Sequence, residues 1–509
     1  MFERSSRPRD ATRKSGRPMT NLALRNGRID GGEPIDLLIE NGTIQQIGVG
    51  LTAPRSIDLE GRHIVPGLWD DHVHLSQHAL AHRRVDVSAA GSAAEAAAIM
   101  AAAAVVRPAE PGLPHVGFGF RDGLWPDAPT AAVLDAALGA HGGLPTVLIS
   151  GDLHCCWLNT AALDRYGFAL HPTGVLREND AFRVTDALQD VPDSVLDAWV
   201  AEAAVTAATR GVVGVVDFEM ADNLTVWSRR IAAGCDWLRV AAGIYTEHLD
   251  AAIAAGHRTG TVIADTGGLL AVGPFKILID GSLNTRTAYC VDEYPGLEGH
   301  PHSHGMLTVS PETLVPMLRR VSAAGMLPAV HAIGDDANRI ALDCFEAAGC
   351  SGRIEHAQLV RDTDLPRFAA LGVTASLQPE QAMDDRDVAD RYWAGRTARA
   401  FPLRSLIDAG ATLVLGSDAP VAPLDPWITI AAAVGRERDG LPAWHPEQAI
   451  SAAEAIAASA HGRRRVAAGD IADLCIVEID PLTATPQALR AMPVSATLIA
   501  GRFTHTLLD

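Results

Sequence analysis

Short apolar runs alternate with alanine-rich segments of helical pattern over most of this chain, and this alternation constrains its fold more than any other feature. Strands that alternate with helices form βαβ units and a parallel sheet. Eight parallel strands predict a closed (β/α)8 TIM-like barrel, in which functional residues lie at the C-terminal strand ends. A doubly wound open sheet is the alternative, but the sequence lacks the glycine-rich phosphate loop that would favour it. The eight runs are IVPGLWDDHVH, VVGVVDFE, LRVAAGIYT, PFKILIDGS, LPAVHAIGD, GRIEHAQ, TASLQP and TLVLGSDAP.

The predicted barrel occupies residues 65–82 and 205–464, with one long interruption. Residues 83–204 are too many for a connection between a strand and the next helix. They contain strand and helix patterns of their own, so they predict an inserted α+β subdomain. Because the insertion leaves the barrel directly after the first strand, we expect it to act as a lid over the site.

The two ends of the chain have a different sequence pattern from the predicted barrel. Residues 19–64 and 465–509 read as short strands broken by Gly and Asn, and we expect them to pair as one composite β-sandwich. Residues 1–18 are basic and polar without an apolar core, which indicates a disordered tail rather than a secretory signal. Met19 is then an alternative start.

Charge and cysteine content narrow the range of partners. Lys and Arg number 42 against 61 Asp and Glu, giving a formal net charge of −19, which disfavours nucleic acid and anionic membranes. No segment reaches the roughly 20 apolar residues that span a bilayer. Seven cysteines in 509 residues do not form a disulfide framework. We therefore expect a cytoplasmic protein with a small-molecule substrate, and a homodimer as the commonest assembly.

The first predicted strand ends in two histidines, His72 and His74. Alternation along a strand places both side chains on the same side, where two imidazoles can bind one divalent metal ion. A His-x-His pair alone is a weak signal. The prediction gains weight from the ends of the later strands.

Four of the later strand ends carry residues that suit a metal site. Lys276 interrupts an apolar run, either as an ion-paired or snorkelling lysine or as a lysine carboxylated by CO2 that bridges two metal ions. His331 and His356 lie on successive predicted strands. Asp418 follows a fully apolar strand, where a carboxylate is costly to bury without a metal or a hydrogen-bonding partner.

Five motifs in this order, PGLWDDHVHL, FKILIDGSLNTRTA, VHAIGD, RIEHAQ and GSDAPV, make the chain similar to the amidohydrolase superfamily. The resemblance is to its amidohydrolase-3 or YtcJ-like branch and runs from about residue 20 to the end; DLHCCWLNTAAL and PTGVLRE in the insertion share it. It implies a metal-dependent (β/α)8 barrel with a small β-sandwich built from both termini. Asp71 departs from the pattern, because a small residue is usual before the first histidine.

The resemblance also implies the metal ligands and their chemistry. One or two divalent ions would bind, most simply zinc, with carboxylated Lys276 as the bridge when two are present. The metal lowers the pKa of a water molecule to about 7, and Asp418 would take a proton from that water and deliver it to the leaving nitrogen. The implied ligands are His72, His74, Lys276, His331, His356 and Asp418.

The substrate is less constrained than the metal site. The leading interpretation is hydrolysis of a non-peptide C–N bond, as in an amide or an N-acyl or N-formyl group. A deaminase or a cyclic-amide hydrolase on the same barrel is the first alternative, and a non-catalytic regulatory or assembly protein is the second. For Trp69, packing in the core is the alternative to substrate contact, and for Asp280, Asn284 and Arg286 it is an ordinary loop ion pair. The residues proposed to contact substrate are Trp69, His154, Asn159, Asp280, Asn284 and Arg286.

Overall fold

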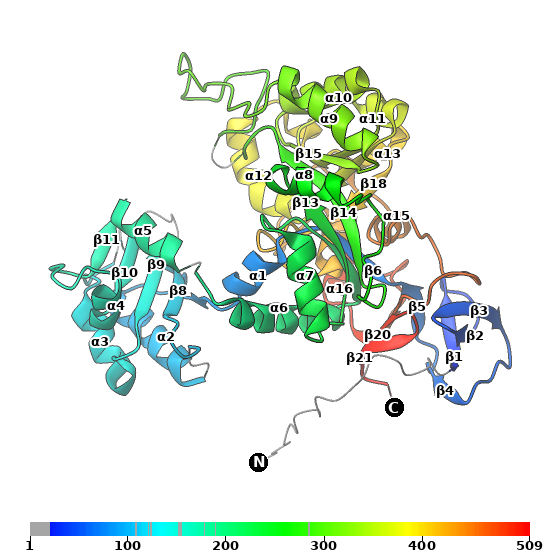
Figure 1. Ribbon diagram of the computed structural model, residues 1–509, viewed down its shortest axis with the longest axis horizontal. Coiled ribbons are helices and arrows are strands. Elements are labelled where there is room, and N and C mark those ends of the chain that lie inside the picture. The colour runs from blue at the N-terminus through cyan, green and yellow to red at the C-terminus, as the bar shows by residue number, and fades with distance from the viewer. Residues whose placement is uncertain are drawn as a thin grey trace. The chain divides into compact units, whose positions relative to one another are not determined.

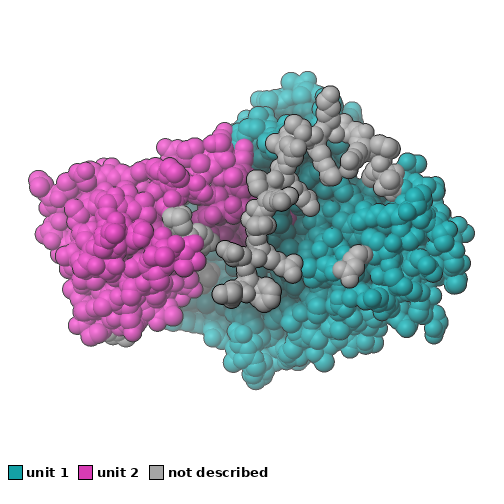
Figure 2. All heavy atoms as spheres, turned by 90° about the horizontal axis from the view of Figure 1, so that it is seen from below, with its two compact units in different colours: residues 1–73, 205–509 teal, residues 74–204 magenta. Residues whose placement is uncertain are grey.

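The computed structural model describes residues 21–106, 109–120, 122, 125–150, 155–177, 179–188, 190–283 and 286–508. The chain forms two compact units, coloured separately in Figure 2. The larger unit combines Met1–Val73 with Val205–Asp509, and the smaller is His74–Ala204. Within the described residues, no helix combines the length and the hydropathy needed to cross a bilayer.

The larger unit contains an eight-stranded parallel sheet (Figure 1). Its last and first strands meet where the Asp418 N–H donates to the His72 carbonyl at 2.7 Å, and Val73 and Ala419 form a parallel bridge beside this bond. The predicted (β/α)8 barrel is therefore confirmed, with one barrel strand in each of the eight apolar runs. In sheet order the strands are β6 (Leu68–Val73), β12 (Val212–Asp217), β13 (Arg239–Ile244), β14 (Leu270–Leu278), β15 (Pro328–Ala332), β16 (Gly352–His356), β17 (Val373–Leu377) and β18 (Leu413–Leu415).

The barrel strands are apolar runs because both of their faces are buried. Every residue of β12, β15 and β16 is buried. The helices turn an apolar stripe inward: α10 (Asp335–Ala348) buries Ile340 and Phe345 and ends at Gly349 in the left-handed conformation. The other helices of this unit are α7 (Asn223–Ala232), α8 (Thr246–Ala254), α9 (Pro311–Ala323), α11 (Leu365–Leu371), α12 (Gln381–Tyr392), α13 (Leu403–Asp408), α14 (Pro426–Gly435), α15 (Ala452–Ala458) and α16 (Pro486–Arg490), with short 3₁₀ turns at Thr397–Arg399 and Pro446–Gln448.

The two ends of the chain share a second sheet, in the order β21-β20-β19-β5-β1-β2-β3 with β4 beside β1. The antiparallel pair of β5 with β19 joins the N-terminal part to the C-terminal part. β1 pairs with β2 and β4 along its first half and with β5 at Arg28 and Ile29. The strands are β1 (Leu22–Ile29), β2 (Ile35–Glu40), β3 (Thr43–Gly48), β4 (Arg55–Asp58), β5 (His63–Pro66), β19 (Leu474–Val477), β20 (Val494–Ile499) and β21 (Arg502–Thr506).

The smaller unit is a five-stranded mixed sheet with helices, in the order β11-β10-β9-β8-β7. The predicted fold class, a (β/α)8 TIM-like barrel with a small β-sandwich from both termini and an inserted α+β subdomain, is thus confirmed as a TIM-like barrel with extra sheets. The strands are β7 (Val85–Asp86), β8 (His115–Phe120), β9 (Thr146–Ser150), β10 (Cys155–Leu158) and β11 (Val175–Arg177). The helices are α1 (Leu75–Ala81), α2 (Ala93–Val106), α3 (Ala131–Leu138), α4 (Thr160–Arg165) and α5 (Asn179–Ala187), with a 3₁₀ turn at Gly139–His141. α6 (Asp193–Ala208) begins in this unit, and its last residues, 205–208, belong to the larger one.

Candidate metal centre

Five of the six predicted ligands lie in the C-terminal halves of barrel strands or just beyond them. His72 is in β6, Lys276 in β14, and His331 in β15. His356 is the last residue of β16, and Asp418 follows the end of β18. His356 and Asp418 both have left-handed backbones, with φ of 73° and 57°. These conformations break the strand alternation at the places where side chains must turn towards the site.

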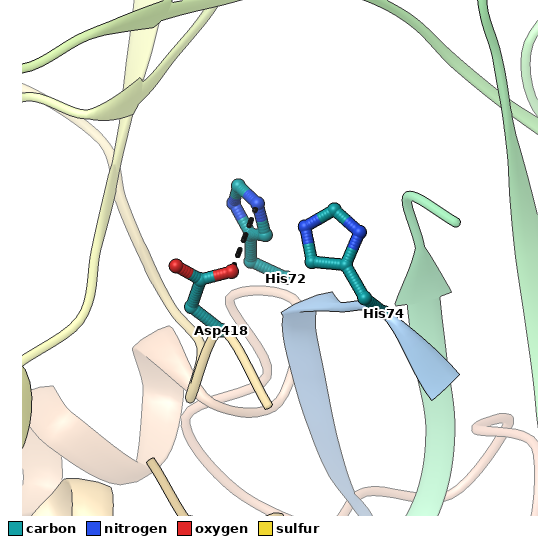
Figure 3. Close-up of side chains that lie close together, drawn as sticks. All are labelled: His72, His74 and Asp418. Atoms are coloured by element: carbon teal, nitrogen blue, oxygen red, sulfur yellow. Dashed lines mark ion pairs between the residues drawn. The ribbon is translucent and has the colours of Figure 1, made fainter. Parts of the chain in front are cut away.

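His72, His74 and Asp418 form one close cluster (Figure 3). One potential ligand atom from each lies within 4.8 Å of the others. His72 Nε2 is 3.6 Å from Asp418 Oδ1, while Gln381 donates a hydrogen bond to Asp418 Oδ2 at 2.9 Å. Burial raises the pKa of Asp418 to about 6, with Lys276 and Gln381 opposing the rise.

Lys276 is buried against the same histidine. Its Nζ lies 3.1 Å from His72 Nε2 and 4.5 Å from the centroid of the Phe218 ring. Burial lowers the pKa of Lys276 to about 8, although the carboxylates of Glu355 and Asp418 act in the opposite direction. Part of the lysine is therefore a neutral amine near neutral pH, and this is the form that can react with CO2.

His331 and His356 complete the group. The rings of His331 and His356 have centroids 4.5 Å apart, and those of His356 and His72 are 5.0 Å apart. Burial, followed by His331, His72 and Lys276, holds the pKa of His356 well below its ordinary value. Neutral imidazoles are the form that binds a metal ion. The structure thus brings all six predicted ligands together.

This set of donors fits a divalent cation. Four imidazoles and a carboxylate, with a lysine able to become a carbamate, are ligands that zinc and similar ions accept. The alternative is a buried group of titratable side chains without a metal, which would carry the full cost of desolvation. The convergence of these donors from five barrel strands favours the metal.

Sequence reasoning missed a second layer of charged residues behind the cluster. Asp70 accepts hydrogen bonds from the N–H groups of His72 and Ser417 at 3.2 and 2.9 Å, joining β6 to the loop after β18. Glu355 accepts a hydrogen bond from His72 Nδ1 at 2.8 Å and another from Arg353. Burial alone would raise the pKa of Glu355, but Arg353 and His72 hold it well below its ordinary value. The available signal was an Arg and a Glu two residues apart within the buried strand GRIEH.

Two proposed substrate contacts have local structural roles, which the sequence interpretation did not foresee. The Asn159 carboxamide accepts hydrogen bonds from the Thr146 and Ala162 N–H groups and caps α4 in the smaller unit. The Asp280 carboxylate accepts hydrogen bonds from the N–H groups of Tyr289, Ile333 and Gly334, and lies 3.5 Å from His331 Nε2.

The other proposed substrate contacts vary in position. Trp69 stacks on His461, with ring centroids 4.0 Å apart. The Arg286 guanidinium lies 5.5 Å from the centroid of the Tyr392 ring. His154 and Asn284 lie outside the described residues.

The sequence of this chain matches a known protein family and several of its members. Residues 55–505 match the profile of the Amidohydrolase family. Protein LONG AFTER FAR-RED 3 of Arabidopsis thaliana is 28% identical, covering 88% of this chain and 84% of that protein. Putative amidohydrolase YtcJ of Bacillus subtilis is 27% identical, covering 92% and 95%. N-substituted formamide deformylase of Arthrobacter pascens is also 27% identical, covering 91% and 94%.

The fold also resembles those of solved hydrolase structures. An uncharacterized metal-dependent hydrolase from Pyrococcus horikoshii superposes with a TM-score of 0.76 at 24% identity, covering 92% of this chain and 99% of that one. Its counterpart from Pyrococcus furiosus gives a TM-score of 0.75 at 26% identity, covering 91% and 100%. The chain therefore belongs to the amidohydrolase family, as a hydrolase of carbon–nitrogen bonds that uses a divalent metal.

Proposed function

We propose that this protein hydrolyses the amide, N-acyl or N-formyl bond of a small molecule at the six-residue cluster of His72, His74, Lys276, His331, His356 and Asp418. The observation that carries the proposal is the position of the Asp418 carboxylate, 3.6 Å from His72 Nε2 at the seam of the barrel. A carboxylate there can be both a metal ligand and a carrier of protons.

We infer that zinc is the metal, held by the four imidazoles and Asp418. A bound divalent cation supplies a water that is nucleophilic at neutral pH and polarises the carbonyl of the substrate. The low pKa of His356 supports this assignment, because the imidazole stays neutral without competition from protons.

Asp418 would move the proton. Gln381 occupies Oδ2, so Oδ1 is the oxygen on the side of His72. Oδ1 takes a proton from the attacking water as the C–O bond forms. The same proton then passes to the substrate nitrogen as the C–N bond breaks, giving an amine and a carboxylic acid. A carboxyl group whose pKa is about 6 before the metal binds suits both transfers.

Lys276 would decide how many ions bind. Addition of its neutral amine to CO2 gives a carbamate and releases one proton, so that a neutral side chain becomes an anionic one. The position of Nζ, 3.1 Å from His72 Nε2, supports carboxylated Lys276 as a residue that would help to hold the metal. Lys276 left as an amine would favour a single ion, because a protonated lysine repels a second cation.

One relative of this chain supports a formyl group on the substrate nitrogen. The deformylase of Arthrobacter pascens acts on N-substituted formamides, and this chain aligns with nearly all of it. This supports N-formyl and other N-acyl amines as the first substrates to test, ahead of the deaminase and cyclic-amide alternatives.

The substrate test compares products. Zinc-loaded protein is incubated with N-formyl amines, N-acetyl amines, cyclic amides and amino-substituted heterocycles, and amine, carboxylic acid and ammonia are each quantified. Release of amine and acid in equal amounts is expected. Ammonia as the only product, or ring opening confined to the cyclic amides, would contradict the proposal.

A further inference from the structure

The barrel interior below the metal cluster is charged, although such interiors are usually filled by branched apolar side chains. Arg353 and Glu355 lie two residues apart on β16 and therefore point to the same side. Arg353 is 6% exposed and Glu355 is 0% exposed. Burial of two ions costs several kcal/mol each unless every charge is well paired. We therefore asked what Arg353 and Glu355 contact at this position.

Glu355 forms a hydrogen bond with one ring nitrogen of His72. Its Oε2 is 2.8 Å from His72 Nδ1. An ionised carboxylate only accepts hydrogen bonds, so Nδ1 carries the proton. The other ring nitrogen, Nε2, lies on the side of Lys276 and Asp418, at 3.1 and 3.6 Å. The Glu355 contact therefore leaves a lone pair on the nitrogen that faces the cluster.

Arg353 holds Glu355 in place. Arg353 Nε donates to Glu355 Oε1 at 2.7 Å, and Nη2 lies 3.3 Å from Oε2. The remaining guanidinium donors reach Asp71 Oδ1 at 3.2 Å, the Asp71 carbonyl at 3.0 Å and Ser376 Oγ at 3.2 Å. Three strands, β6, β16 and β17, thus fix the orientation of one carboxylate.

Asp71 extends the same chain of contacts. Its Oδ1 is 3.4 Å from His461 Nε2, and the His461 ring stacks on Trp69. The sequence signal here is the Asp that directly precedes His72. A small residue could not supply the carboxylate that this geometry pairs with Arg353.

We propose that Glu355 is a positioning residue that sets the tautomer and ring orientation of His72, and that Arg353 and Asp71 hold Glu355 for this purpose. This inference rests on the proposed function, because it assumes that His72 binds the metal through Nε2. Partners of this kind affect metal affinity by about 10- to 100-fold when removed.

Glu355→Gln tests the tautomer directly because it keeps the shape of the side chain. The shortest contact of Glu355 with Arg353 is at Oε1, so the amide oxygen will occupy that position, facing Nε–H. The amide NH2 then faces His72 Nδ1 and donates to it. His72 must carry its proton on Nε2, and the lone pair towards the cluster is lost.

The experiment measures zinc affinity by competition with a chromophoric chelator, together with the ¹⁵N shifts of labelled histidine rings in metal-free protein. We expect Glu355→Gln to bind zinc 10- to 100-fold more weakly and to move one histidine from the Nδ1–H to the Nε2–H pattern. Glu355→Asp keeps the charge but shortens the side chain, so its affinity should be intermediate, with the tautomer unchanged.

Asp473→Asn is the matched control. Asp473 is a buried carboxylate of the same unit that pairs with Arg239 at 2.6 and 3.1 Å. Asp473→Asn should lower the thermal midpoint while leaving zinc affinity and the histidine shifts unchanged.

The outcomes separate the two proposals. Zinc affinity within twofold of wild type in Glu355→Gln, with an unchanged tautomer, would contradict the positioning role alone. If Glu355→Gln does not fold, wild-type affinity in Glu355→Asp would contradict it equally. Wild-type protein that binds no zinc would instead contradict the proposed function.

Discussion

At the scale of single residues, the centre depends on side chains held in one protonation state by burial. Asp418 and Lys276 have pKa values moved towards neutrality, to about 6 and about 8, by the cost of burying their charges. His356 is kept neutral by the same effect. A site with these values can exchange protons near pH 7 without a large change in its surroundings.

Replacing Asp418 by Asn should separate metal binding from turnover. The amide keeps an oxygen ligand but cannot take the proton of the attacking water, so we expect most of the metal to remain and activity to fall by about 10²- to 10⁴-fold. Parallel measurement of kcat and of zinc per chain checks this. A variant that keeps more than a tenth of the wild-type rate would rule out the proposed proton transfer.

At the scale of elements, the most sensitive point is the seam between β6 and β18. A Cβ added at Gly416 would lie 2.7 Å from the His72 nitrogen and 2.9 Å from Asp70 Oδ1. Both neighbours belong to β6, which cannot move without shifting His72. The close approach of the two strands and the geometry of the site therefore depend on the same glycine.

Gly416→Ala should weaken metal binding and destabilise the barrel by about 1–3 kcal/mol. Gly143→Ala is the control, because a Cβ at Gly143 meets nothing within 4 Å. Zinc titration and thermal denaturation of both variants would check the prediction. Gly416→Ala with the metal affinity and the thermal midpoint of the control would contradict this account of the seam.

Helix α1 offers a test by pH. Burial lowers the pKa of His78 to about 4 from its ordinary value of 6.5, and His82 adds to the effect. The unfolded chain therefore binds a proton first as pH falls, so this group reduces the free energy of unfolding between pH 6.5 and 4, by at most about 3 kcal/mol. Above pH 6.5 it has no effect.

His78→Gln should therefore lose less stability than wild type when the pH is lowered from 7 to 4.5. Denaturant unfolding of the two proteins at several pH values gives the comparison, and the difference between them removes the contribution of other histidines. Parallel pH profiles for the two proteins would show that His78 is not the group responsible.

The strands of the barrel could be predicted because each is a continuous apolar run buried on both faces. The candidate ligands could be singled out because they stand where such runs end. The pair of Arg353 with Asp71 could not, because β6 and β16 become neighbours across the interior only after the barrel closes. The backbone contacts of Asp280 and Asn159 could not be predicted either, because sequence shows a polar side chain but not the backbone groups that engage it.

At the scale of the whole molecule, the match over residues 55–505 and the barrel describe one enzyme with added parts at both ends and one insertion. The formal net charge of −19 attracts cations and repels anions over long range. Neutral or cationic amides are therefore expected to reach the site faster than anionic ones.

The most direct test of the central claim is metal content per chain, measured by elemental analysis of protein purified with bicarbonate and without chelator. We predict about two equivalents of divalent metal in the wild type and a loss of metal in His72→Ala. His302→Ala, in an exposed loop, is the control and should match the wild type. No metal in the wild type even after zinc is added, or equal metal in His72→Ala, would contradict the six-residue site.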